Sequence, residues 1–168
     1  MFDDELLVLA RRVLEGCRGS GLRLTTAESC TGGLVIGCLT EIPGSSDVVD
    51  RGYVTYSDTA KQELLGVRGE SLARFGAVSE LVAREMAQGA LARSGADLAV
   101  AVTGIAGPGG GTPDKPVGLV HFAASRRDGP VCHRRHLFPG DRRAVRLAAV
   151  RTALSMLLEA VENSPVIV

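Results

Sequence analysis

The segment TTAESCTGG, residues 25–33, gathers hydroxyl, carboxylate and thiol side chains in front of two glycines. Apolar residues lie on both sides of it, as is typical of a junction between a strand and a helix. Ser29, Cys30 or Thr31 could simply cap that helix. Alternatively, Ser29 or Cys30 is a nucleophile, and the amides at the helix start stabilise the oxyanion that its attack creates. The sequence leaves both interpretations open.

A serine nucleophile needs a base, and Lys61 is the candidate. The chain has nineteen basic residues, of which only Lys61 and Lys115 are lysines. A buried lysine can lose its proton and then accept one from a hydroxyl, which arginine cannot do. On a helix over residues 57–67, Lys61 lies one turn beyond Ser57, so its side chain would point back toward the preceding strand. The alternative is a solvated surface lysine.

The segment TGIAGPGGGTPDKP, residues 103–116, is denser in glycine than an ordinary connection. It matches neither the dinucleotide fingerprint nor the P-loop, because its glycines and lysine have other spacings. Its three prolines would stiffen it, which favours a loop that wraps a ligand over a floppy hairpin. Thr103 would direct its hydroxyl toward the same space.

The segment FPGDRRAV, residues 138–145, puts Arg142 and Arg143 in the first turn of a helix, with Arg146 one turn later. The helix dipole disfavours cations at that end, whereas arginines and free amides together suit a phosphate. The equal alternative is that Asp141 caps the helix while the arginines lie in water.

The order of elements predicts a three-layer α/β/α sandwich with a mixed, mostly parallel sheet, as one domain over residues 1–168. The three segments quoted above and YSDTAK, residues 56–61, fall at strand ends, where such sheets bind ligands. The expected strands are 22–27, 48–56, 96–104, 117–125 and 131–138, and the expected helices are 5–17, 33–42, 57–67, 71–77, 79–95 and 141–160.

Composition limits the classes of function. The net charge is zero and aromatic residues make up 4% of the chain, which argues against nucleic-acid binding. Cys132, His133 and His136 are too closely spaced for a zinc site. Four isolated cysteines without a recognisable signal peptide predict the reducing cytoplasm. No apolar run is long enough to span a membrane.

Several blocks resemble the C-terminal domain of the CinA family, in family order over roughly residues 7–160. They are TAESCTGG, LTEIPGSSDVVDRGYVTYSDTAK, LLGV, GAVSE, AVTGIAGPGGGTPDKPVG and GDR. That family includes nicotinamide-nucleotide amidases. The resemblance implies an α/β/α fold and hydrolysis of nicotinamide mononucleotide to nicotinic acid mononucleotide and ammonia, within pyridine nucleotide salvage. It implies no metal or organic cofactor, and often a homo-oligomer.

The resemblance also implies roles for single residues. Ser29 would be the acyl-forming nucleophile and Lys61 its base, with Tyr56 orienting Lys61 or the substrate. Thr103 would contact the reacting amide or the ribose, and Arg142 the phosphate. The implied substrate contacts are Cys30, Thr31, Gly32, Gly33, Gly104, Ile105, Ala106 and Gly107.

This sequence departs from the family pattern at Asp58, where asparagine is common. It also lacks the molybdopterin-binding-like domain of longer CinA proteins, so we expect a stand-alone amidase. Two other hypotheses stay open: a non-catalytic nucleotide-binding module linked to competence or DNA damage, and an enzyme with Cys30 as nucleophile.

Overall fold

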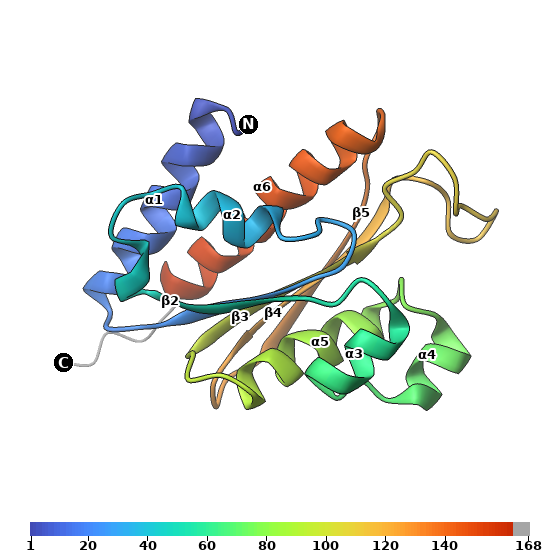
Figure 1. Ribbon diagram of the computed structural model, residues 1–168, viewed down its shortest axis with the longest axis horizontal. Coiled ribbons are helices and arrows are strands. Elements are labelled where there is room, and N and C mark those ends of the chain that lie inside the picture. The colour runs from blue at the N-terminus through green and yellow to red at the C-terminus, as the bar shows by residue number, and fades with distance from the viewer. Residues whose placement is uncertain (163–168) are drawn as a thin grey trace.

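A five-stranded sheet lies between two layers of helices (Figure 1). The structure is a computed structural model that describes residues 1–162. The strand order is β2-β1-β3-β4-β5, with β1 parallel to β2 and β3, and with β4 antiparallel to both β3 and β5. The predicted sandwich with a mixed sheet is therefore confirmed. The strands are β1 (Leu24–Glu28), β2 (Val49–Val54), β3 (Leu98–Gly104), β4 (Leu119–Arg126) and β5 (Val131–Leu137).

The helices divide between the two faces of the sheet (Figure 1). One layer contains α1 (Asp4–Gly19), α2 (Leu34–Thr40) and α6 (Arg142–Glu162), and the other contains α3 (Asp58–Leu65), α4 (Gly69–Phe75) and α5 (Glu80–Ala92). The expected helix 71–77 lies two residues earlier in the structure, as α4. This helix ends at Phe75 because the next residue, Gly76, adopts a left-handed φ of 73°. Within residues 1–162, none of the helices has both the length and the apolar character that crossing a membrane requires.

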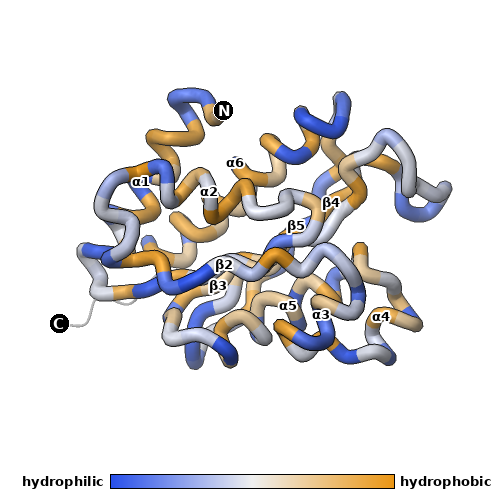
Figure 2. The backbone as a smooth tube through the Cα atoms, in the orientation of Figure 1, coloured by the Kyte–Doolittle hydropathy of each residue, from blue (hydrophilic) through white to orange (hydrophobic). Residues whose placement is uncertain are grey.

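The central strand β3 is covered on both faces, as its apolar sequence predicts. Leu98, Val100 and Val102 pack against the layer of α1, α2 and α6, whereas Ala99 and Ala101 face α5. Apolar segments accordingly gather between the layers in Figure 2. Small side chains on the α5 side allow a close approach of helices, and burial of both faces supplies the main stabilisation of the sheet.

Polar side chains begin the helices where the sequence predicts. Ser57 accepts a hydrogen bond from the Ala60 amide at 3.0 Å and so caps α3, which carries Lys61. Ser79 caps α5 in the same way. These caps satisfy amides that the helix itself leaves unpaired, so each helix starts at a defined residue.

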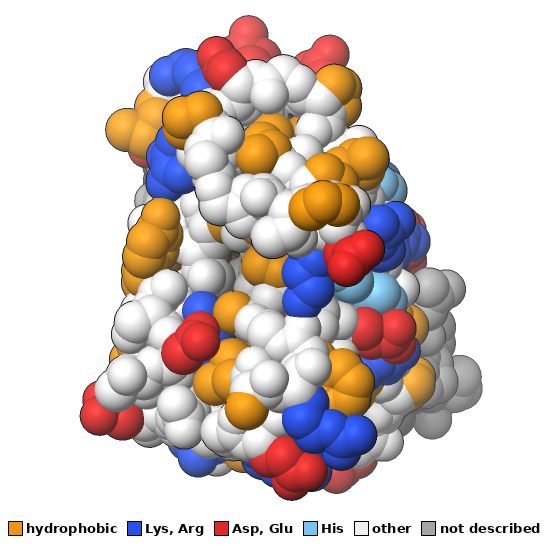
Figure 3. Space-filling model, turned by 90° about the vertical axis from the view of Figure 1, so that its right-hand side faces the viewer, with side chains coloured by type: hydrophobic (Ala, Val, Ile, Leu, Met, Phe, Trp, Pro, Cys, Tyr) orange, Lys and Arg blue, Asp and Glu red, His pale blue; other side chains and the backbone are white. Residues whose placement is uncertain are grey.

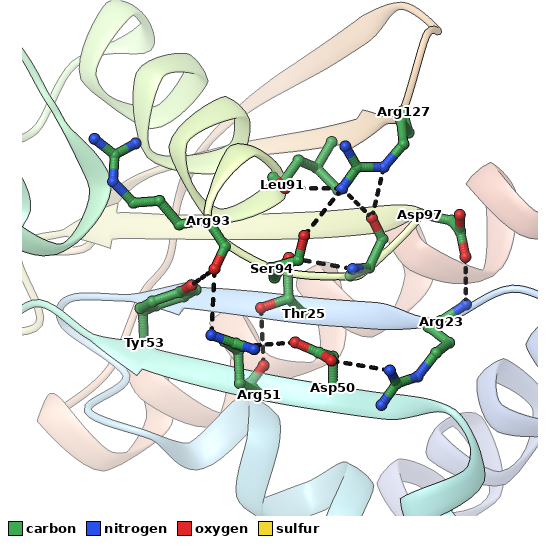
Figure 4. Close-up of polar contacts among 11 residues, drawn as sticks. Arg23, Thr25, Asp50, Arg51, Tyr53, Leu91, Arg93, Ser94, Asp97 and Arg127 are labelled. Atoms are coloured by element: carbon green, nitrogen blue, oxygen red, sulfur yellow. Dashed lines mark hydrogen bonds and ion pairs between the residues drawn. The ribbon is translucent and has the colours of Figure 1, made fainter.

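A polar network fastens the end of the sheet at which β1 and β3 begin (Figure 4). The Arg23 amide donates to the Asp97 carboxylate at 2.8 Å, and the Tyr53 hydroxyl donates to the Arg93 carbonyl at 2.7 Å. The guanidinium of Arg127 donates to the carbonyls of Leu91, Ser94 and Ala96. With its starting end held in this way, the sheet presents the carboxyl ends of β1, β2 and β3 on the opposite side.

Candidate active site

Ser29 and Lys61 meet at the carboxyl ends of β1 and β2. Ser29 directly follows β1, and Lys61 on α3 points back toward the end of β2. The Lys61 Nζ donates hydrogen bonds to Ser29 Oγ at 3.0 Å and to the Thr55 carbonyl oxygen at 2.9 Å. Lys61 is 1% exposed and Ser29 is 9% exposed. The fold thus brings together, out of water, a hydroxyl and an amine that lie 32 residues apart.

The surroundings of Lys61 favour its uncharged form. Burial lowers the pKa of the Lys61 amine below its usual value, and the negative charge of Asp58 opposes this shift with a smaller effect. Among residues 1–162, no carboxylate forms an ion pair with Lys61. A buried amine without an ion-pair partner is suited to accept a proton from the hydroxyl beside it.

Cys30 is adjacent to Ser29 but is chemically less suited to attack. Burial raises the pKa of its thiol to about 11, against smaller effects of its own backbone amide and nearby charges. The thiolate is the reactive form of cysteine, so this thiol stays protonated at neutral pH. The geometry therefore favours Ser29 over Cys30 as the nucleophile.

A cavity of about 280 Å³ opens in front of Ser29 and Lys61. Its walls come from the loop after β1, the first turn of α3, the residues before α5, the glycine-rich segment after β3, and Arg142. Figure 3 looks onto this end of the molecule, where lysine and arginine side chains lie between its upper and lower parts. The cavity is at the lower end of the size range of small-molecule sites, about 300–1,000 Å³.

Most of the predicted contact residues line this cavity, but three do not. Cys30, together with Gly104, Ile105, Ala106 and Gly107, borders it. Thr31, Gly32 and Gly33 lie outside its lining. The two glycines have φ values of 59° and 95°, which other residues rarely adopt, so they shape the turn into α2.

Glu28 is a site residue that sequence reasoning missed. Its carboxylate is fully buried and accepts hydrogen bonds from the amides of Gly33, Val35 and Ile36, at 2.9–3.1 Å. The start of α2 is therefore occupied by Glu28, and the amides of Gly33, Val35 and Ile36 are used inside the protein. An acidic residue just before a helix start was the available signal.

Thr103 lines the cavity with its hydroxyl already engaged. The Thr103 Oγ1 donates to the Ala77 carbonyl oxygen at 2.8 Å, and the residue is fully buried. This bond ties the end of β3 to the segment between α4 and α5, which also borders the cavity. Thr103 consequently contributes to the shape of the wall, and its oxygen keeps lone pairs that can accept a hydrogen bond.

Tyr56 contacts Arg142 and makes no hydrogen bond to Lys61. The Arg142 Nη2 donates to the Tyr56 hydroxyl at 3.1 Å, and Nη1 donates to the Gly107 carbonyl oxygen at 2.9 Å. Asp141 caps α6 by accepting from the Ala144 amide at 2.8 Å. Asp141 is thus the predicted cap and Arg142 lines the cavity, while phosphate binding by Arg142 stays a prediction.

The glycine-rich loop is anchored at both ends. The Ile105 amide donates to the Leu119 carbonyl at 2.9 Å, and the Gly118 amide donates to the Ile105 carbonyl at 2.8 Å. The Lys115 Nζ donates to the Phe75 carbonyl at the end of α4. These bonds favour a shaped wall over a floppy hairpin, and they use Lys115 for structure.

Two larger hollows lie elsewhere on the molecule. One of about 520 Å³ lies beside α3 and α5, and another of about 440 Å³ lies between the β4–β5 hairpin and α6. Neither contains a serine or a lysine. Within residues 1–162, no group of three or more His, Cys, Asp or Glu side chains is placed to hold a metal ion. Of these three cavities, the one in front of Ser29 and Lys61 is therefore the one that combines a serine hydroxyl with a lysine amine.

Comparisons with known proteins agree on one family. A family model described as the CinA C-terminal domain matches residues 7–161. The chain is 51% identical to the nicotinamide-nucleotide amidohydrolase PncC of Escherichia coli K12 over 157 residues, which are 94% of this chain and 95% of that protein. It is 54% identical to a CinA-like protein of Akkermansia muciniphila over 145 residues, which are 86% of this chain and 35% of that protein. The chain thus spans about a third of that longer relative.

Solved structures show the same fold. The competence/damage inducible protein CihA from Agrobacterium tumefaciens superposes with a TM-score of 0.94 at 55% sequence identity, over 97% of this chain and 99% of that one. The competence damage-inducible protein A from Klebsiella pneumoniae gives a TM-score of 0.91 at 43% identity, over 95% and 99% of the two chains.

Proposed function

The chain belongs to the CinA C-terminal domain family, and from that premise we propose that it hydrolyses the carboxamide of nicotinamide mononucleotide. The products are nicotinic acid mononucleotide and ammonia. The observation that carries the proposal is the 3.0 Å hydrogen bond between Lys61 Nζ and Ser29 Oγ inside a buried pocket. The name of the PncC relatives supports the same substrate.

In the first step, the Ser29 oxygen attacks the carboxamide carbon while uncharged Lys61 takes the hydroxyl proton. For this transfer the hydroxyl donates to the lone pair of the amine across the same 3.0 Å, and the Thr55 carbonyl holds the amine in place. The C–N bond then breaks, and the lysine ammonium returns the proton to the departing nitrogen. Ammonia leaves, and a nicotinoyl ester remains on Ser29.

In the second step, water attacks the ester carbon and Lys61 takes a proton from it. The bond between the carbonyl carbon and Ser29 Oγ breaks, and the lysine returns the proton to Ser29. The acid product leaves and the free enzyme is restored. One group therefore acts as base and then acid in each half of the reaction, which requires a pKa that burial has lowered.

Arg142 provides the contact for the phosphate of the nucleotide. It lines the cavity, and its bonds to the Tyr56 hydroxyl and the Gly107 carbonyl hold the guanidinium in one orientation. A guanidinium has five N–H donors, so it can still bind a phosphate after making these two bonds. Tyr56, which is 61% exposed, would lie beside the substrate and orient Arg142. Thr103 would bind the carboxamide or the ribose.

Ammonia release tests the proposal directly. The wild-type protein and Ser29→Ala are incubated with nicotinamide mononucleotide, and both ammonia and nicotinic acid mononucleotide are measured. We expect wild-type turnover and a loss of nearly all turnover in Ser29→Ala, with substrate binding largely retained. Full activity of Ser29→Ala would refute the nucleophile. Binding of the nucleotide without any ammonia release would instead favour the non-catalytic nucleotide-binding module.

The proposal also covers the compartment in which the enzyme works and its oligomeric state. We propose a cytoplasmic enzyme that works as a single domain in a homo-oligomer. All four cysteines are free thiols, which fits a reducing compartment. Light scattering of the purified protein measures the assembly, and a mass equal to one chain would contradict the homo-oligomer.

A further inference from the structure

The loop that carries Ser29 is held by two charged side chains. At its start, the Glu28 carboxylate binds the amides of the first turn of α2. From α6, Arg146 donates through Nε to the Cys30 carbonyl at 3.1 Å and through Nη2 to the Thr31 carbonyl at 2.9 Å. A residue far along the chain thus binds the two peptide carbonyls that directly follow the nucleophile.

The charge of Arg146 has no carboxylate partner among residues 1–162. It faces the loop instead. Gly32 has a φ of 59°, and the Arg146 Nη2 lies 3.4 Å from the point where a Cβ on Gly32 would be. The turn is therefore fitted closely against the guanidinium, and a larger residue at position 32 would strain the backbone and crowd this contact.

Most amides of the loop are already used inside the protein. The Ser29 amide donates to the Val102 carbonyl. The Gly32 amide donates to the Ser29 carbonyl, and the Leu34 amide donates to the Thr31 carbonyl. Gly33, Val35 and Ile36 donate to Glu28.

Two amides of the loop remain. The Cys30 amide favours the thiolate form of its own side chain and so lowers the pKa of that thiol, against the larger effect of burial. The Thr31 amide has no acceptor among residues 1–162, although Thr31 is fully buried. The Thr31 hydroxyl is also buried without a partner in this part of the chain. Thr31 has no exposed surface and lies outside the cavity lining, so these two groups belong to the interior of the loop and not to the substrate site.

We propose that Arg146 is a positioning residue for the hydrolysis. By binding the Cys30 and Thr31 carbonyls, it fixes the loop that holds Ser29 Oγ at 3.0 Å from Lys61 Nζ. The assignment rests on the amidase function proposed above.

The test compares Arg146→Met and Arg146→Lys with Arg151→Met. Arg151 is on the same helix and its side chain forms ion pairs with the exposed carboxylates of Asp3 and Glu5, away from the Ser29 loop, so its replacement controls for the loss of one positive charge. Three quantities are measured for each protein: kcat and KM for nicotinamide mononucleotide, the rate at which a fluorophosphonate labels Ser29, and the melting temperature. The label needs an activated serine and an oxyanion donor but no nucleotide.

We expect Arg146→Met to lower kcat and the labelling rate together, by about 10²-fold, as a misplacement of a reacting group by about 1 Å does. The KM should change by less than about threefold, since the substrate contacts remain. Arg146→Lys should recover part of both rates because it keeps a charge and a donor, and it also provides the measurement if Arg146→Met does not fold. Arg151→Met should match the wild type.

Other outcomes would overturn the assignment. A raised KM with an unchanged kcat would place Arg146 at the phosphate. Unchanged rates in both Arg146 variants would show that the loop holds its shape without the guanidinium. Failure of the amidase function is a separate result. In that case the fluorophosphonate would react with Ser29 of the wild type, but no ammonia would be released from the nucleotide. The labelling rates of the Arg146 variants would then still test the positioning role.

Discussion

Lys61 Nζ donates a 2.9 Å hydrogen bond to the Thr55 carbonyl oxygen, at the point where β2 has just ended. The same nitrogen also donates a hydrogen bond to Ser29 Oγ. A backbone acceptor of one strand thus holds the amine at the end of the neighbouring strand. This arrangement fixes the amine without an ion pair, so the amine can be uncharged without losing a salt bridge.

The first prediction concerns the base. Lys61→Met and Lys61→Arg should each lower kcat by about 10²–10⁴-fold, the usual contribution of a general base, because neither side chain can accept a proton. Gln62→Met, an exposed position next to it on α3, should keep wild-type turnover. Ammonia release under saturating substrate measures each rate. An active Lys61→Arg would contradict the role of Lys61.

The second prediction is a pH profile. The uncharged amine is the active form, so kcat/KM should rise with pH to a plateau. The midpoint of this rise should lie below the ordinary lysine pKa of about 10.4. Asp58 raises the pKa of Lys61. Asp58→Asn should therefore move the midpoint to lower pH. A midpoint that stays in place or moves upward in this variant would contradict the electrostatic role of Asp58.

The third prediction links Lys61 to stability. Below its folded pKa, Lys61 is charged in both states, so the native state bears the full cost of burying an ammonium. Above the ordinary lysine pKa it is neutral in both states and the cost is absent. Between the two values the unfolded chain binds more protons, so the free energy of unfolding rises with pH.

Lys61→Met lacks this dependence. The free energy of unfolding of the wild type, relative to Lys61→Met, should therefore increase as the pH rises toward the ordinary lysine pKa of about 10.4. Urea unfolding at several pH values, followed by circular dichroism, measures the difference. A relative stability that is flat or falls over this range would show that Lys61 stays charged in the native protein.

The fourth prediction concerns Glu28. Glu28→Gln puts an amide donor among three backbone N–H donors, so at least one of them loses its acceptor. The free energy of unfolding should fall by about 1.5–3 kcal/mol, as for lost hydrogen bonds to charged groups. Glu41→Gln, at the exposed end of α2, should change it by less than about 0.5 kcal/mol. Equal stabilities of the two variants would show that the carboxylate is dispensable for α2.

Much of the fold follows from local chemistry that is visible in the sequence. The apolar run of β3 has to be covered on both faces, and hydroxyl caps at Ser57 and Ser79 set where two helices begin. The scarcity of lysine and the cluster of hydroxyls around Ser29 made Ser29 and Lys61 candidates, the resemblance to the CinA family paired them, and the structure brings them together. These signals involve residues close in sequence or the character of a single side chain.

The tertiary structure alone decided which partner each polar group found. Arg142 and Arg146 lie one turn apart on α6, yet one lines the cavity and the other binds the carbonyls after Ser29. Glu28 binds the start of α2, and Tyr56 meets Arg142 rather than Lys61. Helix periodicity predicts which face a side chain is on, but the group that it reaches depends on how α6 packs across α2. That packing is set by the apolar core between them, so no local pattern around these residues contains it.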